Sequence, residues 1–433
     1  MLAAWVPASA AAAGLTWADQ RVTPGGPAGA FGNAAAIDGD VALVGAPFAA
    51  LGGNADQGLL YVYHRDRTSG VWSQVAALTG SGTTAGSEFG TSVAIDGRYV
   101  IVGAPASGNG GDGSAYIFER EGLGIWVEKQ RVQAPAVGAG GRFGDAVAIS
   151  GPGNPGVPQD VRIVIGADGH DHGVDMPDSG AIYSGLASIV DGALQAFPAL
   201  AQWESDAPAA NGLFGASLAL YRAPQGTMKP STIGYLLVGE PGSGAVGVFR
   251  LYLDYVDGNS FQFEQRLQLA DAVDSSTPVN FGYAIGMSRD GYRAAISAPS
   301  ETDGARPSRV AVFDLSTDDW QWHQDALLPP GAAENDYFGR SLSFGHGWLL
   351  VGVPWYDGLG YNTGAGMVFG ESGGGWSLVR TLQTEPGHGA SLGAAAAITT
   401  DGTVLLGASI AQSAHFYTSD DEIFAAGFDG DGP

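Results

Sequence analysis

The chain has 433 residues, 45% of them hydrophobic, and a formal net charge of −25 at pH 7. This hydrophobic content is enough for a large core and excludes intrinsic disorder. The acidic surface excludes nucleic acid and anionic lipid as partners, because both need clustered Lys and Arg. The absence of cysteine excludes disulfides, thiol catalysis and cysteine-ligated metal sites.

The first residues, "MLAAWVPASAAAAGL", are apolar and carry small residues at Ala8 and Ala10. This pattern is typical of the second half of a signal peptide with its cleavage site, although no basic stretch precedes it; the alternative is an Ala-rich tail. We therefore expect residues 1–14 to be a signal-peptide remnant and the protein to be secreted, periplasmic or on the surface of a bacterial cell. No later segment has about 18 uninterrupted apolar residues, so we expect no membrane span.

An internal repeat with seven copies fills residues 15–418. Each copy begins with Phe-Gly and small apolar residues, continues with a run such as "YVIVGAP" and a third run such as "SAYIFER", and often ends in a run that starts with Trp. Four short apolar runs separated by turn residues predict four strands per copy. Repeats of this length predict an all-β, seven-bladed β-propeller with four antiparallel strands per blade. The repeat begins at Phe31, Phe89, Phe143, Phe214, Phe281, Phe338 and, with Leu in place of Phe, at Leu392.

Asp-Gly pairs separate the first and second runs at Asp38, Asp96, Asp290 and Asp401, and they predict two-residue type I′ hairpins. The seventh copy lacks a fourth run, whereas a run with Trp17 precedes the first copy. We therefore expect the N-terminal strand to complete the last blade and close the ring, which removes two exposed sheet edges. The Trp residues of the fourth runs, Trp17, Trp72, Trp126 and Trp376, are expected to pack between blades.

The Phe-Gly and Gly-Ala-Pro pairs resemble the FG-GAP repeat family, which forms the propeller of integrin α subunits and of many exported bacterial proteins. The pairs at Phe31/Pro47 and Phe89/Pro105 match fully, and the other copies match in part. The resemblance implies an integrin-like interaction or adhesion module. Many members bind calcium through an Asp-x-Asp-x-Asp-Gly loop between the first two strands. Here those connections are mostly short hairpins such as "IDGD", so the family's calcium sites do not carry over.

A different loop offers possible metal ligands, because "ADGHDHGVDMPDSG" holds four carboxylates and two imidazoles. Such a set could bind calcium or another divalent cation, and its histidines suit zinc, nickel or copper better than calcium. The alternative is a solvated loop in which Asp residues cap turns. The candidate ligands are Asp168, His170, Asp171, His172, Asp175 and Asp178.

The loops after the second strand of each blade should gather on one face around the axis, where binding residues are common. The loop "PWYDGLGYNTG" places Trp355, Tyr356, Asp357 and Tyr361 on that face. Amphipathic aromatic residues beside acceptors suit protein contacts or sugar stacking. The alternative is that Trp355 covers the rim of its blade.

The sequence has no metalloprotease, phosphate-loop or dinucleotide-binding motif. We therefore predict a non-enzymatic, monomeric exported propeller that binds a protein or glycan on the cell surface through its loop face. One alternative is a carbohydrate-binding or carbohydrate-active propeller with paired carboxylates in its central channel. Another is a structural component of an envelope assembly. Residues 419–433 depart from the repeat and resemble a C-terminal tail of some exported bacterial proteins.

Overall fold

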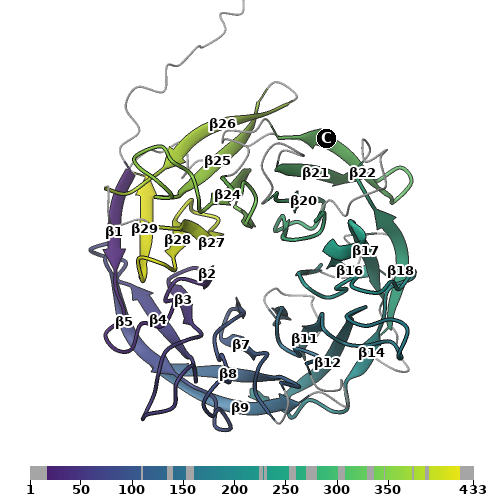
Figure 1. Ribbon diagram of the computed structural model, residues 1–433, viewed down its shortest axis with the longest axis horizontal. Coiled ribbons are helices and arrows are strands. Elements are labelled where there is room, and N and C mark those ends of the chain that lie inside the picture. Colours follow the sequence, from purple (N-terminus) through teal and green to yellow (C-terminus); the bar gives the residue numbers. More distant parts are fainter. Residues whose placement is uncertain are drawn as a thin grey trace, which may run out of the picture.

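The computed structural model describes residues 17–108, 111–133, 140–152, 160–223, 228, 232–252, 260–269, 280–300, 308–328, 336–345, 347–372, 375–385 and 390–419. These residues form seven antiparallel sheets that stand as blades around a central axis (Figure 1). The predicted all-β, seven-bladed propeller is confirmed. The expected signal remnant, residues 1–14, and tail residues 420–433 lie outside the described residues. No helix in the described part is long and apolar enough to cross a membrane.

The first strand of each blade lies nearest the axis and the last lies on the outside (Figure 1). Blades one to three are β2 (Ala34–Asp38), β3 (Val41–Ala46), β4 (Leu59–Arg65) and β5 (Trp72–Leu78); β6 (Val93–Asp96), β7 (Tyr99–Ala104), β8 (Ser114–Gly122) and β9 (Ile125–Gln133); and β10 (Val147–Ser150), β11 (Asp160–Ala167), β12 (Ala181–Val190) and β14 (Ala201–Trp203), with β13 (Ala193–Leu194) as an extra short strand.

Blades four to seven complete the ring. They are β15 (Leu218–Arg222), β16 (Thr232–Glu240), β17 (Ala245–Tyr252) and β18 (Ser260–Leu267), with the 3-10 turn η1 (Pro241–Ser243); β19 (Ile285–Met287), β20 (Arg293–Ala298), β21 (Arg309–Leu315) and β22 (Trp322–Leu327); β23 (Ser341–Phe344), β24 (Trp348–Val353), β25 (Ala365–Ser372) and β26 (Gly375–Leu382); and β27 (Leu392–Ile398), β28 (Val404–Ala408), β29 (Ser413–Ser419) and β1 (Trp17–Val22).

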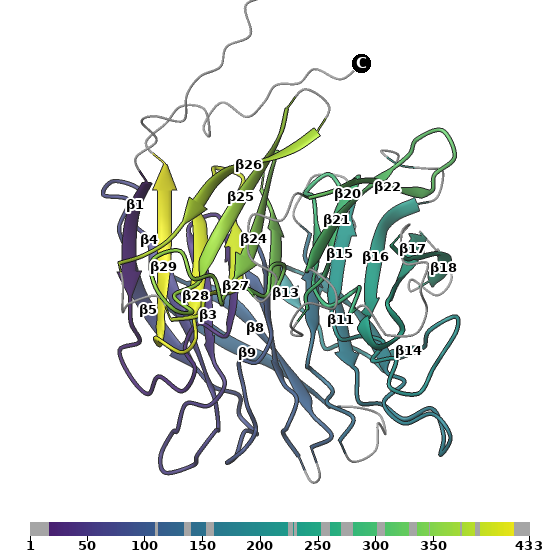
Figure 2. The ribbon, with the colours of Figure 1, turned by 45° about the horizontal axis from the view of Figure 1, so that its top comes forward.

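The N-terminal strand closes the ring as predicted. β1 pairs with β29 in antiparallel register, from Trp17 opposite Ser419 to Val22 opposite Ala414. The two strands lie side by side in Figures 1 and 2. The last blade is therefore built from both ends of the repeat region, and its outer edge is paired.

Each Phe-Gly pair forms the centre of a tight turn. In blade two the N–H of Thr91 donates to the carbonyl of Glu88, at 3.2 Å, and in blade three Asp145 donates to Arg142, at 3.0 Å. The Gly has a positive φ in all seven copies, between 90° and 100°, whereas the residue before it does not. This combination defines a type II turn, whose third position requires Gly.

The same glycines bring neighbouring blades into backbone contact. A Cβ atom on Gly103, of the Gly-Ala-Pro run in blade two, would lie 1.9 Å from the carbonyl oxygen of Gly144 in blade three. The six Phe side chains of the Phe-Gly pairs are buried beneath these contacts. Phe-Gly and Gly-Ala-Pro are therefore structural elements of the blade interface.

The Asp-Gly hairpins differ from the prediction. Asp38 pairs with Val41, so the two turn residues are Gly39 and Asp40, and only Gly39 has a positive φ, of 56°. The prediction of type I′ turns is wrong for this hairpin, because a positive φ at the first turn position alone fits type II′. The Asp instead joins blades, because Oδ2 of Asp38 accepts a hydrogen bond from the N–H of Gly97, at 2.7 Å.

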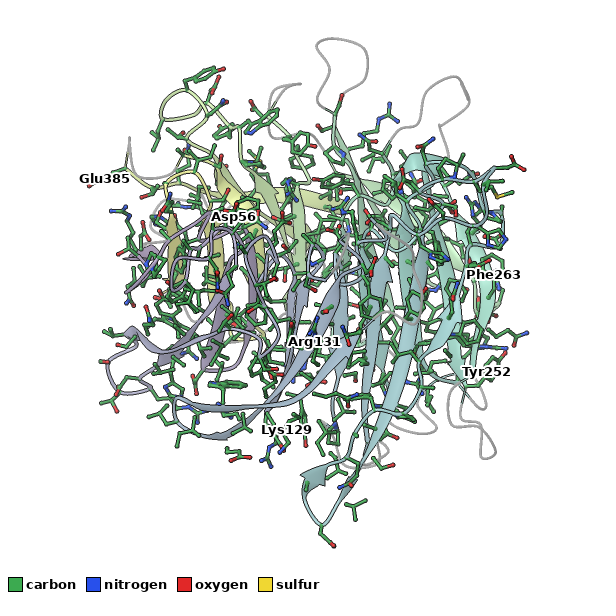
Figure 3. All side chains as sticks on the ribbon, turned by 60° about the horizontal axis from the view of Figure 1, so that its bottom comes forward. Asp56, Lys129, Arg131, Tyr252, Phe263 and Glu385 are labelled. Atoms are coloured by element: carbon green, nitrogen blue, oxygen red, sulfur yellow. The ribbon has the colours of Figure 1, made fainter. Side chains whose placement is uncertain are left out.

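The outer strands are joined across blades by aromatic rings and by glutamine side chains. Trp72 stacks on Phe416 of blade seven with 4.4 Å between ring centroids, which confirms packing between blades for this Trp. Gln20 of β1 donates to the carbonyl of Trp72, at 2.6 Å, and accepts from its N–H, at 2.8 Å. We call such a reciprocal pair a glutamine bridge. Two more glutamine bridges join Gln130 to Phe197 and Gln265 to Trp322. Gln130 is flanked by Lys129 and Arg131, which lie on the side of the ring in Figure 3.

Candidate functional site: the channel mouth

The residue before each Phe-Gly pair has a left-handed backbone. Non-glycine residues rarely adopt a positive φ, and those that do are concentrated at functional sites. Because each one precedes an innermost strand, the topology gathers seven side chains around one end of the central channel. We call this end the channel mouth. Its left-handed residues are Ala30, Glu88, Arg142, Leu213, Asn280, Tyr337 and Ser391, with φ between 47° and 66°.

Blade three contributes two carboxyl groups that share one guanidinium. Nη2 of Arg142 lies 2.5 Å from Oδ1 of Asp145, and Nη1 lies 3.5 Å from Oδ2 of Asp168. Arg142 and Asp145 flank the Phe-Gly turn, whereas Asp168 directly follows β11. The fold therefore unites residues from two segments of the same blade, and we call Asp145 and Asp168 the carboxylate pair.

Burial changes the acidity of the carboxylate pair. The Asp168 side chain is buried, with 4% of the residue exposed, and its Oδ1 has no hydrogen-bond partner among the residues that the structure describes. Burial and the nearby charge of Asp145 raise the pKa of Asp168 to about 7, against the opposing charge of Arg142. Burial also raises the pKa of Asp145, opposed by Arg142 and by Arg340 from blade six.

A third carboxyl belongs to the same electrostatic environment. Burial raises the pKa of Glu88, in blade two, and the charge of Arg142 opposes this effect. A buried carboxyl that stays protonated near neutral pH can donate a proton, and a neighbouring ionised carboxyl can accept one. The arrangement is therefore suited to general acid–base chemistry.

Aromatic side chains occupy the mouth at blades five and six. Tyr337 stacks on Trp355 with 4.9 Å between ring centroids, and Tyr283 meets the edge of Tyr337 at 6.0 Å. The Arg340 guanidinium lies 5.2 Å from the centroid of the Tyr283 ring. Because the charge of Arg340 also opposes the rise in the pKa of Asp145, these side chains and the carboxylate pair belong to one mouth. We call Tyr283, Tyr337 and Trp355 the aromatic group.

The structure brings one of the four predicted ligand-binding residues into this group. Trp355 is half-buried against Tyr337, whereas Tyr356 packs on the core of blades five and six. Asp357 closes its own loop by accepting a hydrogen bond from the N–H of Asn362, at 2.6 Å. Tyr361 is 87% exposed. The assignment of these four residues to ligand binding stays a prediction, with Trp355 the best placed.

The six predicted metal ligands are spread apart. Asp168 faces Arg142, and Oδ1 of Asp171 accepts a hydrogen bond from the N–H of Asp178, at 2.9 Å. His172 lies 2.7 Å from Glu204, and Nε2 of His170 lies 3.3 Å from Nε2 of Gln202. The structure describes all six residues, Asp175 included. Over the described chain, it shows no group of three or more His, Asp or Glu that could hold a metal ion. Metal binding by this loop stays a prediction.

Sequence reasoning missed Glu88, Arg142, Asp145 and Arg340. The signal lay in the alignment of the seven copies, because these residues occupy the variable positions on either side of the constant Phe-Gly pair. Asp168 carried a second signal. It stands where five of the other six copies have the Pro of Gly-Ala-Pro: Pro47, Pro105, Pro241, Pro299 and Pro354.

Seven blades, each with the same glycine-containing turn before its inner strand, define a β-propeller. Residues 72–118 match the FG-GAP repeat family. This segment runs from β5 of blade one to β8 of blade two, so the family resemblance predicted from the motifs is confirmed there.

Two solved structures share the fold across most of both chains. The periplasmic gluconolactonase of Pseudomonas aeruginosa is 15% identical, with a TM-score of 0.50, and the match covers 81% of this chain and 85% of that one. A Bacteroides fragilis protein assigned as a 6-phosphogluconolactonase is 12% identical, with a TM-score of 0.51, and covers 85% and 88%. No curated protein matches the chain significantly.

The names of these two structures correct the prediction that the protein is not an enzyme. Both similar structures are described as lactonases, which are enzymes, and this finding contradicts the prediction of a non-enzymatic binding or adhesion module. It agrees better with the alternative of a carbohydrate-active propeller. At these identities the likeness establishes a common fold, so the activity has to be argued from the channel mouth.

Proposed function

We propose that the protein is a carbohydrate-active hydrolase that opens sugar lactones at the channel mouth. The observation that carries the proposal is the carboxylate pair, in which the half-buried Asp145 and the buried Asp168 share the Arg142 guanidinium and Asp168 has a pKa of about 7. The names of the two similar structures support the substrate class.

The roles of the carboxylate pair follow from charge. Asp145, 2.5 Å from Arg142, is the general base that takes a proton from water as the water oxygen attacks the lactone carbonyl carbon. Asp168 is the general acid that gives its proton to the ring oxygen as the bond between that oxygen and the carbonyl carbon breaks. Water and lactone thus become a hydroxy acid. The cations Arg142 and Arg340 stabilise the negative charge that develops on the carbonyl oxygen.

The aromatic group orients the sugar. Trp355 is half-buried on Tyr337 and therefore presents a fixed ring at the mouth. An aromatic face packs well against the C–H face of a sugar ring, which buries apolar surface without competing for the sugar hydroxyls. We further infer that the protein acts outside the cytoplasm, supported by its apolar start and by the periplasmic origin given for one similar structure. That it acts as a monomer stays a prediction.

The experiment is a pH-stat assay of glucono-δ-lactone opening above the spontaneous rate. We expect Asp168→Asn and Asp145→Asn each to lower kcat/KM by about 100-fold or more. Asp175→Asn is the matched control, because Asp175 is in the same chain segment as Asp168 but makes no contact with Arg142. Circular dichroism would confirm that each variant is folded. Opening at the spontaneous rate by the wild type, or full activity in Asp168→Asn, would refute the proposal.

A further inference from the structure

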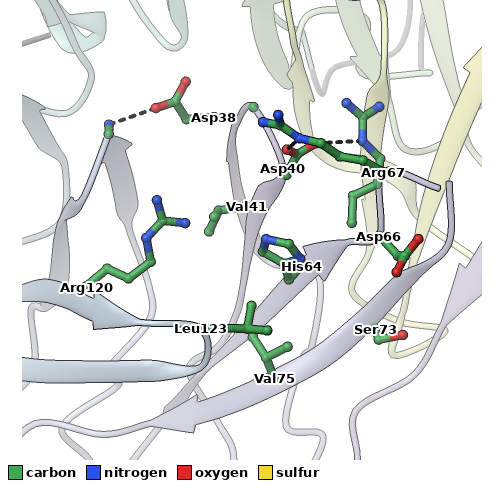
Figure 4. A pocket seen from close by; sticks show the side chains of 13 residues that line it. Asp38, Asp40, Val41, His64, Asp66, Arg67, Ser73, Val75, Arg120 and Leu123 are labelled. Atoms are coloured by element: carbon green, nitrogen blue, oxygen red, sulfur yellow. Dashed lines mark hydrogen bonds and ion pairs between the residues drawn. The ribbon is translucent and has the colours of Figure 1, made fainter. Parts of the chain in front are cut away.

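A second cleft lies between blades one and two, at the axial end away from the channel mouth. Its walls come from the β2–β3 hairpin, the end of β4, β5, and the β8–β9 turn (Figure 4). Its volume is about 610 Å³. This volume lies within the range of about 300–1,000 Å³ that is typical of small-molecule sites.

The acidic side chains of this cleft already have partners within the protein. Oδ2 of Asp38 accepts from the N–H of Gly97, at 2.7 Å, as Figure 4 shows. Oδ1 of Asp40 lies 3.0 Å from Arg65, and Arg67 binds the other oxygen. Oδ1 of Asp66 accepts from the N–H groups of Thr68 and Ser69, both at 2.8 Å. The carboxylates therefore stabilise turns and contacts between blades within the protein itself.

Two side chains of the cleft that can donate hydrogen bonds have no partner within the described protein. Among the residues that the structure describes, neither Arg120 of β8 nor His64 of β4 makes a side-chain hydrogen bond or ion pair. They line the cleft from different blades (Figure 4). The chain has 44 acidic and only 19 basic residues, so an arginine without a carboxylate partner is unexpected. Its five N–H groups remain available to an anion.

Part of the cleft lining is apolar. Val41, Val75 and Leu123 form this part, and Leu123 is 70% exposed at the tip of the β8–β9 turn. Exposed apolar side chains beside a free cation favour a ligand with two unlike ends. One end would be anionic and the other would cover the apolar surface.

We propose that this cleft binds a small organic acid with one carboxylate and an apolar body of several carbons. The Arg120 guanidinium pairs with both carboxylate oxygens, because its planar fork matches their geometry. His64 donates a further hydrogen bond, and the apolar body covers Val75 and Leu123. This site is separate from the channel mouth and does not depend on the proposed hydrolase activity.

Isothermal titration calorimetry of the full chain with three matched probes tests the proposal. Hexanoate has both the carboxylate and the apolar body, acetate has only the carboxylate, and 1-hexanol has only the body. We expect 1:1 binding of hexanoate, and binding of acetate and of 1-hexanol weaker by about tenfold or more. Arg120→Gln should weaken hexanoate binding by about tenfold or more. Leu123→Ser should weaken hexanoate binding but leave acetate binding unchanged.

Arg21→Gln is the control, because Arg21 is exposed on β1 of blade seven and does not line the cleft. It should bind hexanoate like the wild type. Circular dichroism of each variant without ligand separates lost binding from lost folding, and Leu123→Ser at the exposed turn keeps the test valid if Arg120→Gln unfolds. The proposal is overturned if the wild type does not bind millimolar hexanoate, or if folded Arg120→Gln and Leu123→Ser bind it as well as the wild type.

Discussion

A Cβ atom on Gly407 would lie 2.0 Å from the carbonyl oxygen of Gly32. The two glycines belong to the last and the first blade, so this contact closes the ring beside its channel. Gly103 and Gly144 make the equivalent contact between blades two and three, at 1.9 Å. In six of the seven blades the glycine of this run therefore contacts the Phe-Gly turn of the next blade through bare backbone, whereas blade five has Ser297 at this position.

Replacing Gly407 should destabilise the whole propeller. In Gly407→Ala the new methyl group meets backbone that cannot move without separating blades seven and one, so we expect a loss of about 2–3 kcal/mol in the free energy of unfolding. Urea denaturation followed by tryptophan fluorescence measures the change. Gly375→Ala is the control, because no atom lies within 4 Å of its Cβ position. Equal midpoints for the two variants would contradict the argument.

Asp168 should make stability depend on pH. Its pKa is raised from 3.8 to about 7 in the folded state, so between these values the folded chain binds more protons than the unfolded chain. Stability therefore falls as pH rises from about 4 to about 7. Asp168→Asn cannot ionise, and we expect it to gain at least about 1 kcal/mol relative to wild type between pH 4.5 and pH 8. Urea titrations at both pH values test this, and parallel pH dependence of the two proteins would refute it.

The proposed proton donor also predicts a pH profile for hydrolysis. With Asp168 as general acid, kcat/KM should fall about tenfold for each pH unit above about 7. Arg142→Gln removes the charge that opposes the raised pKa of Asp168, so this limb should move to higher pH. A pH-stat series between pH 5.5 and 9 measures the limb. An unchanged limb in Arg142→Gln would exclude Asp168 as the titrating group.

Trp355 and Tyr361 offer a matched test of sugar binding. Trp355→Ala removes the ring that stacks on Tyr337, so we expect KM for the lactone to rise by about fivefold or more while kcat changes little. Tyr361→Ala, in the same loop and 87% exposed, should leave both constants unchanged. The opposite pattern in steady-state kinetics would place the sugar elsewhere on this face.

The repeat made the fold predictable from the sequence. Phe89 and Gly103 have six counterparts each, or close substitutes such as Leu392 and Ser297, and the same contact imposes the same residue type in every blade. The hairpin type was not predictable, because Asp38 could stand inside the turn or just before it. Only the pairing with Val41 decides between these positions.

The site was harder to predict because it combines positions that differ between repeats. Asp145 and Asp168 are 23 residues apart, and β10 and β11 lie between them. Nothing local in the sequence indicates that Arg142 contacts both. Asp168 was singled out for the neighbouring His residues, which the fold directs to Gln202 and Glu204 instead. The tertiary arrangement, rather than local spacing, selects the partners.

The glutamine bridges make the junctions between neighbouring blades unequal. They join blade seven to one, two to three, and four to five through Gln20, Gln130 and Gln265. Within the described chain no such bridge crosses from blade one to blade two, where the second cleft lies. A closed ring of near-identical blades would have no preferred point of opening. In this ring the junctions without a bridge, that between blades one and two among them, should part before the bridged ones, and amide exchange should be faster along their strands.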